Sequence, residues 1–318
     1  MWVRAGSKLL TAMEYDADSN RHQSPDGIHA GSQYLSMPYR KQVISLTPEW
    51  SEVSQKDWID YISSDMGQIV RAVLDPLMLE QIRPQGKVLL DIGCGEGYFA
   101  RVLKAAGAAR VVGADISPAL IKKAQEQDPD GEYQVFDIAS GPLSPPGGFD
   151  AVSACMVLMD LPDLDIAYRN ISASLAPSGH LIACMINPYY AFPVGEWRWA
   201  LRDGLHHVFD PRHRTPKRFV RQVHGVLLGE FDWILYIGNY FERRVVEKML
   251  GNAATLHFHK PFSDYVNLAA KHGLVLQLLL EPQISGELHE RYAHEPLARA
   301  LTTVPLFFVL VFAKVSQL

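Results

Sequence analysis

Residues 88–102 read VLLDIGCGEGYFARV, and this stretch decides the fold. It begins with an apolar run typical of a buried strand and continues with Asp91 and three glycines at alternate positions, Gly93, Gly95 and Gly97. The pattern then changes to the spacing of an amphipathic helix. Glycine lets the chain turn tightly and lets a ligand approach the backbone, and a helix start offers N–H groups and a partial positive charge. The stretch therefore predicts a strand, a glycine turn and a helix that form a nucleotide pocket.

The glycine spacing separates two kinds of cofactor. A dinucleotide fingerprint has its third glycine three residues after the second, and Tyr98 stands there instead. This departure disfavours a pyrophosphate. The core DIGCGEGYF resembles motif I of the class I S-adenosylmethionine-dependent methyltransferases, whose cofactor carries a carboxylate, an ammonium group, a ribose and an adenine. The resemblance implies that Asp91 holds the ammonium side and that Gly93, Cys94 and Gly95 pack against the methionyl part.

A second acid follows the next predicted strand. Residues 110–114 have strand character and lead into Asp115, about twenty residues past the glycine turn, where an acid can reach a pair of ribose hydroxyls. An acid at a strand end can also cap the next helix, but Ser117 and Pro118 already supply the cap and the first-turn residue. We therefore predict that Asp115 binds the ribose and that Ile116 packs on the adenine face.

A third acid and a fourth strand extend the resemblance. Residues 133–136 form a predicted strand that ends in Asp137. The resemblance implies that Asp137 accepts from the adenine amino group and that the backbone N–H of Ile138 meets a ring nitrogen. A lone Asp after a strand is usually a turn residue. Asp137 is the third acid to follow a successive strand, which favours a binding role for it. Residues 149–154 resemble the family's FDxV motif, and Cys155 follows where ligands bind in open α/β sheets. We expect main-chain contact there rather than thiol chemistry.

The resemblance covers residues 60–187 well and the C-terminal part loosely. It implies an α/β fold, a three-layer Rossmann-like sheet of seven strands whose last strand is antiparallel. Helical patterns over 66–82, in which Pro76 should bend or divide the helix, and 262–272, with Ser263 as its cap and Gly273 after its end, fit this fold. The turn residues 177–179 should precede a strand over 180–186, and two more strands are expected over 274–280 and 305–313. The predicted organisation is an N-terminal arm and helical lid (1–60), a cofactor-binding core (61–187 and 261–318) and a substrate cap inserted after strand 5 (188–260).

The predicted cap and lid are rich in aromatic residues. Residues 188–260 are too long for one crossover connection, so we interpret them as an inserted cap. Tyr189, Trp197 and Tyr240 are the candidate substrate-binding residues in it. A basic run in the cap could bind an anionic substrate, but a solvated helix face is the better interpretation. Tyr61, at the start of the core, is the candidate that closes over the cofactor, although packing onto the core is at least as good an interpretation of it.

The general base is predicted among the histidines. Related small-molecule enzymes often have His-Pro after strand 5, whereas this chain has Asn187 there, so one candidate base is missing. An imidazole titrates near neutral pH and can take a proton as the methyl arrives. We rank His259 first and His207 second, although for any single histidine a surface or hydrogen-bonded role is the better interpretation. His257 alternates with His259, so both would face the same way in an extended segment.

Composition limits the other classes of function. The 318 residues are 48% hydrophobic and 20% charged, and the net charge of -5 argues against a general nucleic-acid surface. The three cysteines read as buried free thiols of a reducing compartment, and no spacing suggests a metal site. No signal peptide is evident, and the longest apolar run is about half the length that spans a bilayer, so we expect a cytoplasmic protein that does not bind membranes. The segment 281–303 can form a pocket wall or a subunit contact, which leaves a homo-oligomer open.

The sequence thus predicts methyl transfer from S-adenosylmethionine, without a metal, to an O, N or C atom of a small molecule, such as a metabolite or natural product. Two alternatives stay open. One is a methyltransferase that acts on RNA or protein, and the other is a cofactor-binding regulatory subunit without turnover. The sequence does not identify the acceptor.

Overall fold

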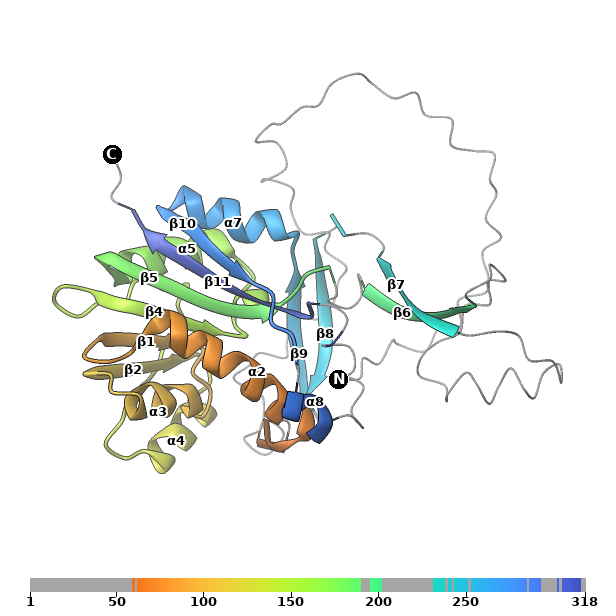
Figure 1. Ribbon diagram of the computed structural model, residues 1–318. Coiled ribbons are helices and arrows are strands. Elements are labelled where there is room, and N and C mark those ends of the chain that lie inside the picture. The colour runs from red at the N-terminus through yellow and green to blue at the C-terminus, as the bar shows by residue number, and fades with distance from the viewer. Residues whose placement is uncertain are drawn as a thin grey trace, which may run out of the picture.

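The computed structural model describes residues 59–60, 62–189, 195–201, 231–237, 240–241, 243–250, 253–284, 286–292, 302 and 305–315. Its centre is a seven-stranded sheet with the order β10-β11-β5-β4-β1-β2-β3 (Figure 1). The strands are β1 Val88–Ile92, β2 Arg110–Asp115, β3 Glu132–Val135, β4 Phe149–Cys155, β5 Leu175–Ile186, β10 Leu274–Leu280 and β11 Phe307–Lys314.

The directions of the strands match the expected Rossmann-like topology. The five strands from β5 to β3 pair in parallel, whereas β11 pairs antiparallel with both β5 and β10. The last strand of the described sheet is therefore the antiparallel one, as the resemblance implied. Because β1 lies between β4 and β2, the chain order reverses there, and such reversal points are where open α/β sheets bind ligands.

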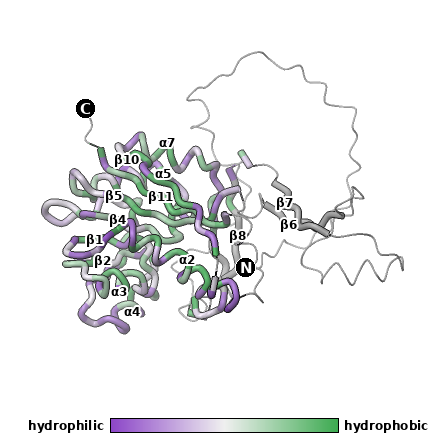
Figure 2. The backbone as a smooth tube through the Cα atoms, in the orientation of Figure 1, coloured by the Kyte–Doolittle hydropathy of each residue, from purple (hydrophilic) through white to green (hydrophobic). Residues whose placement is uncertain are grey.

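Helices cover both faces of the sheet because alternate strand residues point to opposite sides. Leu89 of β1 joins a buried cluster with α2 (Asp65–Ile82) and α3 (Tyr98–Ala105), whereas Leu90 and Ile92 join the cluster of α5 (Leu164–Ser174) and α7 (Phe262–Lys271). Figure 2 shows the apolar residues concentrated along the central strands. The remaining described helices are α4 (Pro118–Gln127), the short 3-10 helix η3 (Leu158–Asp160) and α8 (Gly286–Arg291). Among the described helices, none has the length and apolarity needed to cross a membrane.

Three local expectations differ from the structure. Pro76 does not divide α2, because apolar residues on either side of it, Leu74 and Met78 among them, are buried in the same core. Ser263 does not cap α7. The helix begins at Phe262, and the hydroxyl of Tyr240 accepts from the Phe262 N–H at 2.6 Å, which satisfies a first-turn donor. Gly273 follows the helix with φ 73°, as predicted.

The third difference concerns the turn expected before strand 5. Residues 177–179 belong to β5, which begins at Leu175 rather than His180. The pairing with β4 shifts register after Phe149, which sits opposite Leu175 while Ala151 sits opposite His180. An irregular pairing of this kind absorbs extra residues without ending the strand.

The described part of the predicted cap consists of two antiparallel ribbons. In the first, β6 (Gly195–Leu201) pairs with β7 (Phe231–Ile237), and in the second, β8 (Arg244–Leu250) pairs with β9 (Ala253–His259). The second ribbon leads directly into α7. Tyr61, His207 and the basic run of the cap lie outside the described residues, as does the side chain of Trp197, which belongs to β6.

Candidate functional site

The glycine turn after β1 has the backbone that only glycine adopts readily. Gly93, Gly95 and Gly97 have φ angles of 62°, 56° and 79°. A Cβ on Gly93 would lie 2.3 Å from Cγ2 of Val157, in the turn after β4, and one on Gly97 would lie 2.7 Å from Cε1 of Tyr133. The turn therefore brings the ends of β1 and β4 into close contact, with α3 beginning directly behind it.

Asp91 carries the most informative atom of the site. Its side chain is buried, and its Oδ1 accepts a hydrogen bond from the Ser153 hydroxyl at 2.6 Å. Its Oδ2 is buried and has no hydrogen-bond partner among the described residues. Burial raises the pKa of Asp91 to about 7, because the ionised form loses its water. Buried carboxylate oxygens normally have partners, so this oxygen fits a ligand that brings a cation, such as an ammonium group.

Asp115 holds the glycine turn and lies, like Asp91, at the carboxyl edge of the sheet. Its Oδ2 accepts from the N–H of Gly95 at 2.8 Å and its Oδ1 from the N–H of Ser117 at 2.9 Å. The hydroxyl of Ser117 caps α4 by accepting from Leu120, as predicted. Burial raises the pKa of Asp115. Each carboxylate oxygen has a second lone pair, so Asp115 can hold the turn and still accept from ribose hydroxyls.

Neighbouring residues at the same edge offer an apolar face and further polar groups. Ile116 is 43% exposed beside Asp115, although isoleucine is usually buried. Asp137 is exposed, and its Oδ1 accepts from the N–H of Ala139 at 2.8 Å. The carbonyl of Ile138 accepts from Asn170 at 2.7 Å, which fixes this loop against α5. An exposed apolar side chain flanked by acceptors suits a flat heterocycle with an amino group.

Cys155 ends β4 beside the glycine turn. Its Sγ lies 3.0 Å from that of Cys184 on β5, and this contact together with burial raises the pKa of the Cys155 thiol well above its ordinary value. The Cys155 thiol is therefore a weaker acid than a free cysteine. Met156 follows with φ 60°, an unusual value for a residue with a side chain, and its N–H donates to the Cys184 carbonyl at 2.8 Å.

Sequence reasoning missed an ionic network that fastens the turn to α2. Glu96, inside the glycine turn, is 4% exposed and pairs with Arg101 at 2.6 Å and with Arg71 at 3.4 Å. The Arg71 guanidinium lies 3.6 Å from the centre of the Tyr98 ring, and the Tyr98 hydroxyl donates to Asp75 at 2.9 Å. A glutamate between two glycines was a visible signal, but its partner on α2 is 25 residues away and only the fold brings them together.

The candidate acceptor residues lie after β5, before β8 and on β9. The ring of Tyr189 stacks on that of Tyr240, with centroids 4.4 Å apart and planes within 2°. His259 is buried, and its Nε2 lies 2.8 Å from the carbonyl oxygen of Tyr240. A carbonyl oxygen only accepts, so the neutral ring carries its proton on Nε2. His257 is also buried, with Nδ1 3.5 Å from Oδ1 of Asp160.

Lys260 is a second feature that the sequence did not reveal. It is 3% exposed, and its Nζ donates to the carbonyls of Leu161 at 2.6 Å and Phe258 at 3.2 Å. Burial lowers its pKa to about 7. These bonds tie β9 to the turn after β4. No group of three His, Cys, Asp or Glu side chains in the described part of the chain is arranged to hold a metal ion.

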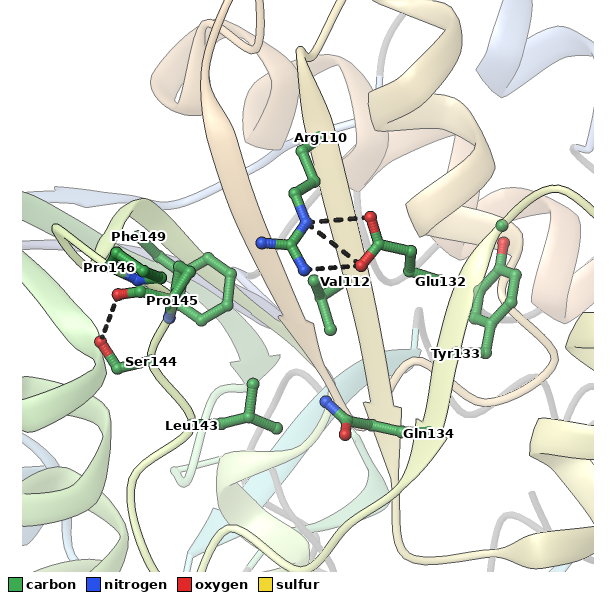
Figure 3. Close-up of a pocket in the computed structure, with 11 residues that line it drawn as sticks. Arg110, Val112, Glu132, Tyr133, Gln134, Leu143, Ser144, Pro145, Pro146 and Phe149 are labelled. Atoms are coloured by element: carbon green, nitrogen blue, oxygen red, sulfur yellow. Dashed lines mark hydrogen bonds and ion pairs between the residues drawn. The ribbon is translucent and has the colours of Figure 1, made fainter.

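A recess of about 460 Å³ lies elsewhere, at the amino ends of β2, β3 and β4. Arg110 and Glu132 form an ion pair across it, and Gln134 and Phe149 also line it (Figure 3). These residues lie at or near the starts of their strands, so the recess belongs to the opposite edge of the sheet from the glycine turn.

Comparison with known proteins identifies the core. A family model described as a methyltransferase domain matches residues 62–215. Over 122 residues the chain is 30% identical to the ubiquinone biosynthesis O-methyltransferase of Xanthomonas axonopodis pv. citri, which covers 36% of this chain and 51% of that protein. Over 175 residues it is 29% identical to the malonyl-[acyl-carrier protein] O-methyltransferase of Serratia marcescens, which covers 55% of this chain and 66% of that protein. The chain thus spans about half the length of the first of these relatives.

The fold also resembles that of a known methyltransferase structure. An S-adenosylmethionine-dependent methyltransferase structure from Mesorhizobium loti superposes with a TM-score of 0.56 and 21% identity, covering 80% of this chain and 99% of that one. The glycine turn and the acids at the carboxyl ends of β1 and β2 lie within the segment that the family model matches. Residues 62–215 therefore form a methyltransferase domain, and the fold is that of the S-adenosylmethionine-dependent methyltransferases.

Proposed function

We propose that the protein transfers a methyl group from S-adenosylmethionine to an O, N or C atom of a small-molecule acceptor. The observation that carries this proposal is the buried Oδ2 of Asp91, which lacks a partner among the described residues and lies beside a glycine turn. Both named relatives are O-methyltransferases, which supports an oxygen acceptor first. The three cysteines are free thiols, which suits the reducing cytoplasm as the compartment.

The residues at the carboxyl edge would hold the cofactor by matching its polar groups. Asp91 would accept from the ammonium, Asp115 from the ribose hydroxyls and Asp137 from the adenine amino group, while the Ile138 N–H donates to the ring and Ile116 covers it. The turn residues Gly93, Cys94 and Gly95, together with the main chain at Cys155, would border the methionyl part, and Tyr61 would close over it. Bound S-adenosylmethionine supplies an activated methyl on a sulfonium, so the main task of the chain is to align an acceptor with it.

The acceptor would lie against the aromatic residues of the cap, Tyr189, Trp197 and Tyr240. When the acceptor is a hydroxyl or a protonated amine, a base must take its proton. We propose His259 for this role and His207 as the second candidate. Asp160, beside His257 in the turn after β4, would add a carboxylate to the same edge.

The experiment that tests the proposal follows a labelled methyl. The protein is incubated with S-adenosylmethionine carrying a tritiated methyl group and with a panel of phenols, amines, carboxylic acids, RNA and protein. The proposal predicts label in a small-molecule product, and much less label in a matched reaction with Asp91→Asn at the same cofactor concentration. Label confined to RNA or protein would contradict the acceptor class, and cofactor binding without any transfer would favour a regulatory subunit.

Asp115→Ala is expected to weaken binding of S-adenosylhomocysteine by about 1–3 kcal/mol, because ribose hydroxyls and the Gly95 N–H lose their acceptor. Isothermal titration calorimetry measures this loss. Ser117→Ala is the matched control, since it removes the cap of α4 and leaves the carboxylate in place. An Asp115→Ala protein that binds as tightly as the Ser117→Ala protein would show that Asp115 only braces the turn.

His259→Gln is expected to lower kcat about 10²-fold with saturating cofactor if His259 is the base. Glutamine retains an amide N–H that can donate to the Tyr240 carbonyl, so the change separates proton transfer from packing. The measurement is the rate against pH on the acceptor found in the panel, with His257→Gln as the control on the same strand. A rate within a few-fold of the parent at every pH would exclude His259 as the base.

A further inference from the structure

Tyr189 and Tyr240 form an aromatic shelf, by which we mean their two stacked rings. Their centroids are 4.4 Å apart and their planes are parallel within 2°. One face of Tyr189 is therefore covered by Tyr240, yet Tyr189 remains 40% exposed. The stack with Tyr240 occupies only one of the two faces of the Tyr189 ring. A stacked ring with an open outer face can extend its stack by one more flat ring.

The lower ring of the shelf is fixed by hydrogen bonds at both ends. The Tyr240 hydroxyl accepts from the N–H of Phe262 at 2.6 Å, at the start of α7. The Tyr240 carbonyl lies 2.8 Å from Nε2 of His259, at the end of β9. The His259 ring also contacts the Tyr240 ring edge-on, with centroids 5.9 Å apart. Tyr240 therefore has little freedom to rotate away from Tyr189.

The upper ring is fixed through its main chain. The N–H of Tyr189 donates to the Asn187 side-chain oxygen at 3.0 Å, and the Asn187 amide donates to the carbonyl of Pro305 at 2.8 Å. The main-chain N–H of Asn187 also donates to the Leu306 carbonyl at 2.9 Å. Asn187 thus ties the segment after β5 to the start of β11. A pre-organised surface binds with less loss of conformational entropy.

The shelf lies at the same edge of the sheet as the cofactor residues. Cys184 of β5 pairs in register with Cys155 of β4, and Tyr189 follows Cys184 by five residues. Five extended residues span at most about 18 Å. A cofactor held at the glycine turn, together with a small-molecule acceptor, is therefore long enough to reach the shelf.

The charge around the shelf favours an uncharged ring. Burial raises the pKa of Tyr240 well above its ordinary value, so its hydroxyl stays neutral. Asp264, whose charge acts on Tyr240, forms two 2.7 Å hydrogen bonds with Arg243, so the two charges offset each other. We propose that the acceptor is a planar aromatic compound, such as a phenol, whose ring stacks on the outer face of Tyr189. This inference rests on the proposed function and names its substrate class.

The test is binding of 4-fluorophenol, followed by its fluorine NMR signal, to protein saturated with S-adenosylhomocysteine. The wild type is expected to bind the probe, and phenol but not cyclohexanol should displace it. Tyr189→Leu, which keeps apolar bulk without a ring, should weaken binding about tenfold, whereas Tyr189→Phe should stay within about twofold. Phe241→Leu is the control. Phe241 follows Tyr240 in the same turn and is 81% exposed, but its ring contacts the Tyr240 ring edge-on and is not part of the stack.

Each other outcome overturns the inference. No binding to the wild type, equal displacement by cyclohexanol, or equal binding by Tyr189→Leu would show that the shelf does not hold an aromatic ring. A larger loss in Phe241→Leu than in Tyr189→Leu would place the ring elsewhere. The titration is repeated without S-adenosylhomocysteine, so that a failure of the cofactor assignment is seen separately from a failure of ring binding.

Discussion

Gly93→Ala is expected to abolish detectable binding of S-adenosylhomocysteine and to lower the free energy of unfolding by about 2–5 kcal/mol. The left-handed φ of 62° costs a residue with a Cβ about 1–2 kcal/mol. The new methyl would also lie 2.3 Å from Cγ2 of Val157. Valine is stiff because it is branched at Cβ, so the turn after β4 must move, and overpacking of this kind costs about 1–3 kcal/mol.

A matched control separates the backbone cost from the collision. Gly86 has φ 73°, and nothing lies within 4 Å of a Cβ placed on it. Gly86→Ala should therefore lose only the backbone part of the stability and bind the ligand normally. Calorimetry and chemical denaturation measure both quantities. Equal stability losses in the two variants, with binding intact in Gly93→Ala, would mean that Val157 does not press on the glycine turn.

Asp91→Asn is expected to make the protein more stable while it weakens cofactor binding by about 2–5 kcal/mol. The folded-state pKa of Asp91, about 7, lies above the ordinary aspartate value of 3.8 because the carboxyl is buried. Between these values the folded state holds a proton that the unfolded state has lost, so stability falls as pH rises. Above pH 7 the full cost of burying the charge is present, about 4 kcal/mol at 1.36 kcal/mol per unit.

The effects of Asp91→Asn should therefore depend on pH. Its stability should match that of the wild type near pH 4 and exceed it by up to about 4 kcal/mol at pH 8. Cofactor affinity of the wild type should rise from pH 5 to pH 7 as Asp91 ionises, and that of Asp91→Asn should stay flat. The affinity measurements stop below about pH 7.5, because the α-amino group of the ligand loses its own proton near 7.7–8.0, whereas the stability measurements extend to pH 8. Parallel pH profiles for the two proteins would contradict the assignment of Asp91.

The sheet could be predicted because its signals are local. The run at residues 88–92, the glycines after it and the acids at the strand ends each depend on neighbours in the sequence, and the structure places them at one edge. The strand over 274–280 has the predicted bounds for the same reason. Residues 177–179 were misread, because a register shift against β4 overrides local preference. Of the two effects expected of Pro76, the division of α2 does not occur, because residues on both sides of the proline are buried in one core.

The polar contacts of the site could not be read from the sequence. Lys260 reaches Leu161 across 99 residues, and the hydroxyl of Tyr240 replaces the predicted cap of α7. The unpartnered, buried Oδ2 of Asp91 could not be predicted from the sequence either, because it depends on which neighbouring groups do not reach it in the fold. The roles of Tyr61, Trp197 and His207 stay predictions, because those residues or their side chains lie outside the described part of the chain.

Direct titration of S-adenosylmethionine and S-adenosylhomocysteine into the folded protein, with a chelator present, tests the central claim most directly. We expect saturable heat for both ligands, with one site per chain and no requirement for a metal. Because Asp91, Asp115 and the glycine turn all face one edge, Asp91→Asn should bind more weakly in the same cell. No heat for either ligand, with a sample shown to be folded by its cooperative thermal unfolding, would contradict the cofactor assignment and with it the proposed function.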